Sequence, residues 1–208
     1  MRIFVLAKAP VPGRVKTRLA ATAGEHVAAR VYRQVTEQVL RVAVDTGMPV
    51  TLACAPGPAH PFFHQLRRRH GVALCTQPAG GLGRRLQLLL HGGVRSDGTS
   101  AVVGADCAGL TGDLLRGAAQ ALAAGNDGAI APAQDGGYVL LAVRRAYPAL
   151  FRGVPWSTSA VLATTRRRAR SAGIQLTQLP TSWDLDDERD WRRWRRGKTS
   201  VPLNLLQR

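Results

Sequence analysis

This sequence is poor in the features that mark disulfide scaffolds, structural zinc sites and membrane spans. Its three cysteines, Cys54, Cys75 and Cys107, form no C-x-x-C pair, which argues against a disulfide framework or a zinc site. No apolar run reaches the roughly 18–20 residues that a membrane helix needs. Met1 leads directly into a strand-like run without a signal-like apolar segment. We therefore expect a cytoplasmic protein with no membrane span.

Familiar catalytic signatures are also missing. The five histidines form no H-E-x-x-H pattern. The chain has no nucleophile elbow and no catalytic triad in a recognisable order. It has neither a G-x-G-x-x-G run nor a P-loop. These absences argue against a histidine-bound metal, a serine nucleophile and the two commonest glycine-rich nucleotide loops.

Acidic residues are scarce. The 13 Asp and Glu residues stand against 29 Lys and Arg, which gives a net charge of +16. Lysine occurs only at positions 8, 16 and 198, so the excess is almost entirely arginine. Arginine with abundant Ala and Gly is typical of a GC-rich genome, and a phosphate site would account for the remainder. The alternative is attraction of an anionic partner such as a nucleic acid.

In that alternative, the chain is a basic nucleic-acid-binding module without catalytic activity. Three arginine clusters would contact the phosphates and two tryptophans would stack on bases: Arg67–Arg69, Arg166–Arg168, Arg192–Arg196, Trp191 and Trp194. These clusters lie on expected helices, where a solvated charged face is commoner. The three-residue spacing of the tryptophans also suits packing of one helix face on the core. Nucleic acid is therefore the less favoured partner.

Apolar runs of strand length alternate with helical patterns along the chain. The expected strands are Arg2–Ala7, Val50–Ala55, Val72–Thr76, Ala101–Gly104, Gly128–Ala133, Tyr138–Val143 and Leu176–Leu179. The expected helices are Ala28–Thr46, Pro61–Arg69, Leu82–Arg95, Thr111–Ala124, Ser157–Gly173 and Glu188–Arg196. Several strands are continuous apolar runs, as in sheets covered by helices on both faces.

This alternation predicts one α/β domain over residues 1–196, with a mostly parallel central sheet flanked by helices. Only Gln134–Gly137 separates two of the strands, so no crossover helix fits there. Those two strands form a small antiparallel hairpin or turn sharply apart. Residues 197–208 form a basic and then apolar tail, which docks on the domain, docks on a second subunit of a homodimer, or frays.

The opening motif carries the strongest chemical signal. A short strand runs into a loop, Lys8–Leu19, that holds Pro10, Pro12, Gly13 and the cations Lys8, Arg14, Lys16 and Arg18. A strand, a basic loop and a helix present cations and backbone N–H groups to an anion at the carboxyl end of a sheet. This arrangement favours a polyphosphate ligand. A solvated basic turn is the alternative.

Carboxylates follow two of the expected strands. Asp106 follows Val102–Gly104, where one carboxylate plus substrate phosphates would suit Mg²⁺, although it could instead cap a loop. Asp135 opens an Asp-Gly-Gly turn before Tyr138, and either residue could contact a ligand.

Two later segments are equally open to interpretation. Ser157 or Thr158, beside Trp156, can cap the following helix. Asp184 and Asp186 could supply a second metal ligand, or could cap the last helix and favour its positive end.

Taken in order, these motifs resemble a bacterial family of glycosyltransferases in the nucleotide-diphospho-sugar transferase superfamily, which includes arsenosugar-biosynthesis members. The likeness extends from Ala7 to Asp186 and is strongest in the opening motif and in Asp135–Tyr138. It implies a Rossmann-like GT-A fold and a metal-dependent transferase acting on an NTP or an NDP-sugar. A small-molecule acceptor would be the second substrate.

The resemblance also implies the site residues. Mg²⁺ or Mn²⁺ would be held by Asp106 with Asp184 or Asp186, and the catalytic set would be Asp106, Lys16 and, as a weaker candidate base, Asp135. The nucleotide would be bound by Ala7, Lys8, Gly13, Lys16, Arg18 and Gly83. The chain departs from the family at Ala108, where Pro is common, and at Gly80–Arg84, where acidic residues are common. The acceptor or the activity would differ accordingly.

Overall fold

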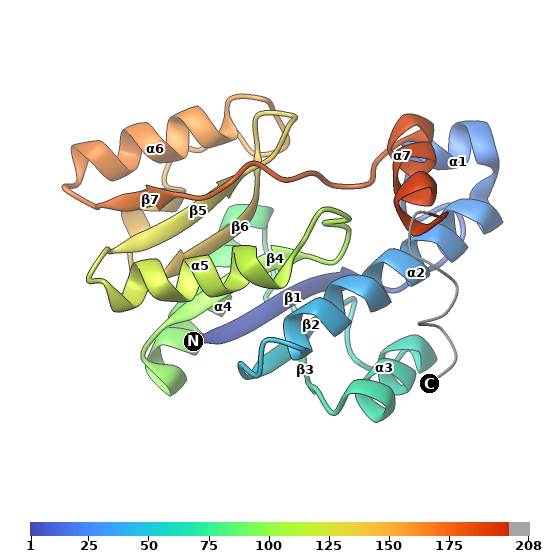
Figure 1. Cartoon of the computed structure of the whole chain (residues 1–208), viewed down its shortest axis with the longest axis horizontal. Helices are drawn as coiled ribbons and strands as arrows, with labels where there is room; N and C mark the ends of the chain where they lie inside the picture. The colour runs from blue at the N-terminus through green and yellow to red at the C-terminus, as the bar shows by residue number, and fades with distance from the viewer. Residues whose placement is uncertain (200–208) are drawn as a thin grey trace.

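A computed structural model describes residues 1–199 of the chain as an α/β/α sandwich (Figure 1). Seven strands form one sheet in the order β3-β2-β1-β4-β6-β5-β7, in which β6 alone runs antiparallel to its neighbours. The strands are β1 (Arg2–Lys8), β2 (Val50–Ala55), β3 (Ala73–Thr76), β4 (Ser100–Gly104), β5 (Gly128–Pro132), β6 (Tyr138–Val143) and β7 (Leu176–Gln178). The predicted strands and the mostly parallel sheet with one antiparallel element are confirmed.

The helices are α1 (Thr17–Ala23), α2 (Glu25–Val44), α3 (Pro61–His70), α4 (Leu82–Asp97), α5 (Gly112–Ala123), α6 (Val161–Ser171) and α7 (Glu188–Thr199), with a 3₁₀ turn η1 (Pro148–Phe151). Within residues 1–199, none of them is both long and apolar enough to cross a membrane. Because α7 runs to Thr199, the predicted tail begins inside this helix. The rest of that tail, residues 200–208, lies outside the described residues.

Three helical segments differ from the sequence prediction. Helix α1 was not predicted, because seven residues are too few to show a 3.6-residue period. Gly24, at φ 85°, separates it from α2. The η1 turn was also missed. Helix α6 begins four residues later than predicted, because Ser157 adopts a left-handed conformation with φ 66°.

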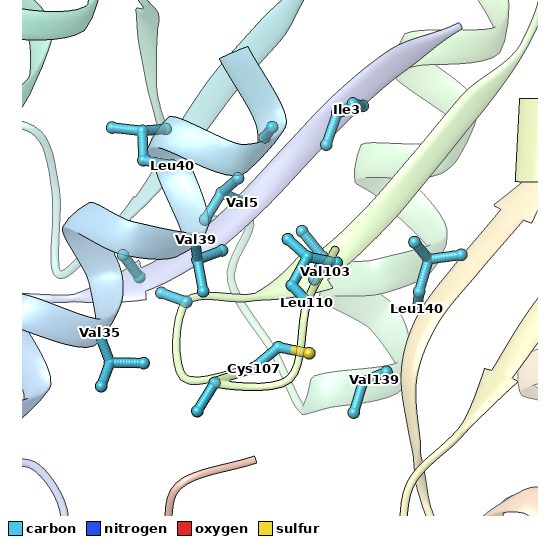
Figure 2. Close-up of a cluster of buried hydrophobic side chains, with 14 of the residues drawn as sticks. Ile3, Val5, Val35, Val39, Leu40, Val103, Cys107, Leu110, Val139 and Leu140 are labelled. Carbon is cyan, nitrogen blue, oxygen red and sulfur yellow. The ribbon is translucent and has the colours of Figure 1, made fainter. Parts of the chain in front are cut away.

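Alternate residues of each strand point into two separate hydrophobic cores. On one face, Ile3 and Val5 of β1 pack with Val103 of β4, Leu140 of β6 and the apolar face of α2 (Figure 2). On the other face, Phe4 and Val102 pack with residues of α4, η1 and α6. Burial on both faces explains why these strands are nearly continuous apolar runs.

We expect Leu140→Ala to destabilise the protein by about 2–5 kcal/mol, because Leu140 is 1% exposed in the larger core and truncation leaves a cavity. The matched control is Leu88→Ala on α4, where the side chain is 42% exposed and the change should cost less than about 0.5 kcal/mol. Urea unfolding of both variants measures the difference. Equal free energies of unfolding would contradict the assigned burial of Leu140.

The β5–β6 hairpin brings a turn to the functional edge of the sheet. β5 pairs antiparallel with β6, and Gly137 carbonyl accepts the Ala133 N–H, which closes the turn. β6 then pairs antiparallel with β4, while β1 and β4 run parallel. The carboxyl ends of β1, β4 and β5 and the start of β6 therefore meet at one edge, where open α/β sheets bind ligands.

Candidate functional site

A cleft of about 830 Å³ opens at this edge of the sheet, which is a volume typical of small-molecule sites. Its charged lining comes from separate parts of the chain. Cations come from the opening loop and from α4, and carboxylates come from the loop after β4, the hairpin turn and the segment before α7. The charged residues are Lys8, Arg14, Lys16, Arg18, Arg85, Asp106, Asp135, Asp184 and Asp186.

Lys16 joins the two charged halves of the cleft. Its Nζ donates to Asp106 Oδ2 at 2.6 Å and to Asp186 Oδ1 at 2.7 Å, and its side chain is only 7% exposed. Burial alone would lower the pKa of Lys16. The attraction of the two carboxylates and their hydrogen bonds outweigh burial and hold this pKa above the ordinary lysine value. Lys16 is therefore a permanent cation in the metal-free, ligand-free protein.

The backbone of Lys16 is unusual. It precedes α1 with φ 48° and ψ 50°, the left-handed region that residues with a side chain seldom adopt. Strain of this kind persists only where surrounding contacts hold it. Here the two ion pairs and the buried Val15 and Leu19 on either side hold the loop against the sheet.

Backbone hydrogen bonds hold the segment before α7 against the loop after β4. Leu185 N–H donates to Asp106 carbonyl at 2.9 Å, and Gly109 N–H donates to Trp183 carbonyl at 3.1 Å. The approach needs a glycine, since a Cβ on Gly109 would lie 2.5 Å from the Trp183 ring. These contacts place Asp184 and Asp186 beside Asp106, although 78 residues or more of sequence separate them from it.

Helix capping is therefore not the role of Asp184 or Asp186. The carboxylate that caps α7 belongs to Asp187, whose Oδ1 accepts the Asp190 N–H at 3.0 Å. Asp190 in turn accepts the Asp186 N–H, which completes a reciprocal arrangement at the helix start. The Asp184 and Asp186 side chains remain on the cleft.

The carboxylate cluster fits a divalent cation. Asp106 and Asp186 already converge on one cationic nitrogen, and Asp184 Oδ1 is buried without a hydrogen-bond partner. Burial, and then repulsion from the Asp106 carboxylate, raises the pKa of Asp184 to about 8. Among residues 1–199, no group of three or more His, Cys, Asp or Glu side chains is arranged to hold a metal ion. One or two carboxylates completed by substrate phosphates is the usual Mg²⁺ arrangement.

Three of the predicted nucleotide-binding residues do not line the cleft directly. Ala7 is buried and its carbonyl accepts from Gln77 Nε2. Gly13 supplies a turn at φ 75°. Gly83 lies at the start of α4, where a Cβ would be 2.4 Å from Trp156 Nε1, so its lack of a side chain lets Trp156 pack on the helix. Lys8, Lys16 and Arg18 do line the cleft.

The opposite wall consists of the hairpin turn and the loop after η1. Asp135 lines the cleft, and its Oδ1 accepts the Gly137 N–H at 2.9 Å. Asp135 therefore stabilises the turn and also borders the cleft. Gly136 has φ 89° and lies against Ser159 carbonyl, with no room for a Cβ. Trp156 stacks on Phe151 and meets Tyr138 edge-on. Trp156 therefore both packs in the core and borders the site.

The predicted cap at Ser157 or Thr158 is wrong. The residue before α6 is Ala160, and no side chain caps this helix. Thr158 Oγ1 instead donates to Pro155 carbonyl and accepts the Ala160 N–H within the loop. The left-handed Ser157 delays the helix start.

Sequence reasoning missed several lining residues. Tyr32 on α2 accepts the Lys8 N–H at its hydroxyl, 2.8 Å away, and so fixes the end of β1. Gln77 donates to the carbonyls of both Ala7 and Ala53, and Arg85 reaches Gln77. A tyrosine on the apolar face of α2 and a glutamine directly after β3 were the available signals, since each is a polar group at the edge of a core.

The tryptophans of α7 pack rather than stack. Trp194 is 5% exposed, and its Nε1 donates to Gln38 Oε1 at 2.8 Å. Trp191 is half-buried against the larger core. Figure 1 shows α7 beside α1, close to the start of α2. The nucleic-acid alternative needs two tryptophans that stack on bases. Because Trp194 is buried, it cannot serve as one of them.

Solved structures share this fold. A structure from Desulfovibrio desulfuricans G20, provisionally described as a nucleotide-diphospho-sugar transferase, superimposes with a TM-score of 0.87 at 26% identity, over 98% of this chain and 90% of that one. A nucleotidyl transferase from Methanothermobacter has a TM-score of 0.61 at 15% identity, over 95% and 97%. A 4-diphosphocytidyl-2C-methyl-D-erythritol synthase from Anaerococcus prevotii has a TM-score of 0.61 at 8% identity, over 95% and 98%.

The last two similarities concern the fold alone. None of the curated proteins matches the chain significantly. Residues 18–158 match the family described as an uncharacterized protein conserved in bacteria, DUF2064. The match covers most of the sandwich, from α1 to the loop before α6. The chain therefore belongs to this bacterial family, and its fold is that of the nucleotide-diphospho-sugar transferases.

Proposed function

We propose that this protein is a divalent-metal-dependent transferase that acts on a nucleotide substrate, either an NTP or an NDP-sugar. One observation carries the proposal: Lys16 of the basic loop and the Asp106 and Asp186 carboxylates meet within 2.7 Å in a single cleft. The cleft thus offers cations for phosphate oxygens and carboxylates for a metal side by side. Structures of the same fold that are described as transferases support this assignment.

Each half of the cleft has a separate task in this proposal. Lys8, Arg14 and Arg18 bind phosphate oxygens and orient the nucleotide, with Lys16 nearest the reacting phosphate. Asp106, with Asp184 or Asp186, would hold Mg²⁺ or Mn²⁺. When bound, such an ion offsets the charge that develops on the phosphates and on the leaving group. Arg85, at the start of α4, lies beside Gln77 and lines the same cleft.

Two reactions fit this arrangement. In nucleotidyl transfer, an acceptor oxygen attacks the α-phosphorus and pyrophosphate leaves. In glycosyl transfer, an acceptor hydroxyl attacks the sugar and NDP leaves, and Asp135 is the candidate base on the acceptor side. The cytidyl chemistry named for the Anaerococcus structure makes cytidine nucleotides the first compounds to test. Release of pyrophosphate or of NDP distinguishes the two reactions.

We expect a nucleotide with Mn²⁺ to stabilise the protein against heat. A ligand at 100 times its Kd adds about 2.7 kcal/mol to the free energy of unfolding. The measurement is a thermal-shift screen of each NTP and NDP-sugar, with and without Mn²⁺, and the corresponding nucleosides without phosphates are the control. Tight, salt-sensitive binding of random oligonucleotides, with no shift by any nucleotide, would contradict the transferase and support the nucleic-acid module.

A further inference from the structure

The Lys16 ammonium lies where the proposed metal would have its carboxylate ligands. Its Nζ contacts Asp106 Oδ2 and Asp186 Oδ1 at 2.6 and 2.7 Å, so the same two oxygens face one cation. The side chain is 7% exposed, while Asp106 and Asp186 are 34% and 43% exposed. The Lys16 side chain is thus far less exposed than the two carboxylates that it contacts.

We propose that Lys16 is an internal counter-ion that keeps Asp106 and Asp186 from holding a divalent cation until a nucleotide's phosphates draw the ammonium away. This inference rests on the proposed function, because it needs a phosphate-bearing ligand in the cleft. It adds an order of binding: the nucleotide, alone or as its metal complex, binds first, and the bare metal ion does not bind on its own. Lys16 is thus a positioning residue for the metal as well as a phosphate ligand.

Electrostatics support this order. Two cations compete for the same pair of oxygens, since like charges about 4 Å apart near a protein surface repel each other strongly. A triphosphate reverses the balance, because it offers the ammonium new anionic partners and brings oxygen ligands for the metal. Lys8, Arg14 and Arg18 line the same cleft and attract that anion.

The direct test measures Mn²⁺ binding to nucleotide-free protein, with free Mn²⁺ followed by electron paramagnetic resonance. We expect Lys16→Met to bind Mn²⁺ at least about 10-fold more tightly than the wild type, because the carboxylates lose their internal cation. Methionine is similar in length to lysine, and both side chains carry the same energetic cost of the left-handed backbone at this position. The double variant Lys16→Met/Asp106→Asn should lose this gain in Mn²⁺ affinity, because a neutral amide then replaces one of the two carboxylates.

The matched control is Lys8→Met. Lys8 belongs to the same loop and lines the same cleft, but its side chain is exposed and Lys16 alone bridges the two carboxylates. The Lys8→Met substitution removes the same unit of charge as Lys16→Met, but it leaves the contacts between Lys16 and the two carboxylates in place. We expect its Mn²⁺ affinity to stay within about 3-fold of the wild type, as for a screened surface charge. An equal gain in both variants would show that only the net charge of the cleft matters and would overturn the proposal.

A second measurement uses the unaltered protein, so it does not depend on whether the variant folds. The chain has only three lysines, at positions 8, 16 and 198, and mass spectrometry can follow each one during mild acetylation. We expect Lys16 to react slowly in free protein and to stay slow when millimolar Mn²⁺ is added without nucleotide, because the bare ion does not displace the ammonium from Asp106 and Asp186. A Lys16 acetylation rate that rises when Mn²⁺ is added without nucleotide would overturn the proposal.

The readouts also separate this inference from the proposed function. A nucleotide-dependent thermal shift with no gain in Mn²⁺ affinity in Lys16→Met would leave the transferase in place and refute the counter-ion. A gain in Mn²⁺ affinity without any nucleotide shift would support the Lys16 contact and refute the nucleotide substrate.

Discussion

Asp106→Ala is expected to lose at least about 100-fold in turnover while the protein stays folded. Asp106 sits at the carboxyl end of β4 beside Lys16 and the Asp184–Asp186 segment, so its loss removes a fixed charge from the reacting centre. Removal of one preorganised electrostatic element typically costs about 100–1,000-fold in turnover. Stability should change little, because the carboxylate is 34% exposed and Lys16 keeps Asp186 as a partner.

The measurement is the rate of pyrophosphate or NDP release with the nucleotide that the thermal-shift screen identifies, alongside the melting temperature. Asp113→Ala is the matched control, since that carboxylate is 92% exposed on α5 and pairs with Arg116, away from the cleft lining. It should keep wild-type turnover. If Asp106→Ala turned over within about 10-fold of the wild type, the metal role of Asp106 would be wrong.

Gly109→Ala is expected to impair activity through the position of the second carboxylate. A Cβ at this residue would lie 2.5 Å from the Trp183 ring and 2.6 Å from Ser182 Oγ. The segment that carries Asp184 and Asp186 must then move away from the loop that carries Asp106. We expect a loss of about 1–3 kcal/mol in the free energy of unfolding and of at least about 10-fold in turnover, since misplacement by about 1 Å can cost 100-fold.

Gly92→Ala controls for the added methyl group. Gly92 is exposed inside α4, and a Cβ there has nothing within 4 Å. Alanine at an exposed helix interior stabilises by up to about 1 kcal/mol, so this variant should be active and slightly more stable. Denaturant unfolding and turnover of both variants make the comparison. Full activity in Gly109→Ala would show that the cleft does not need the close approach of these two segments.

The order of strands and helices could be read from the sequence because burial on both sheet faces leaves a clear apolar pattern. The Gln134–Gly137 linker was short enough to exclude a crossover, and the structure contains the hairpin. The meeting of Lys16 with Asp106 was also predictable in outline. Both follow strands, β1 and β4, that are parallel neighbours, so the loops after them share one edge.

The details of the site depended on contacts that no local pattern encodes. Asp186 faces Lys16 because backbone hydrogen bonds join its segment to the loop after β4, and sequence alone left Asp184 and Asp186 as possible helix caps. Ser157 looked like an ordinary cap, but its left-handed backbone moves the helix start to Val161. Such outcomes are decided by packing between distant segments, which outweighs the preferences of single residues.

Because β6 runs antiparallel to its neighbours, the two walls of the cleft come from different parts of the sheet. The wall with the basic loop and Asp106 belongs to the parallel half of the sheet, whereas the wall with Asp135 and residues 156–159 hangs on the hairpin and the loop that precedes α6. Under the proposed transferase function, we expect loop replacement at 134–137 and 155–160 to change acceptor choice while the wall with the basic loop and Asp106 keeps its structure. In that function, the boundary between the two walls would separate the residues that bind the donor from those that select the acceptor.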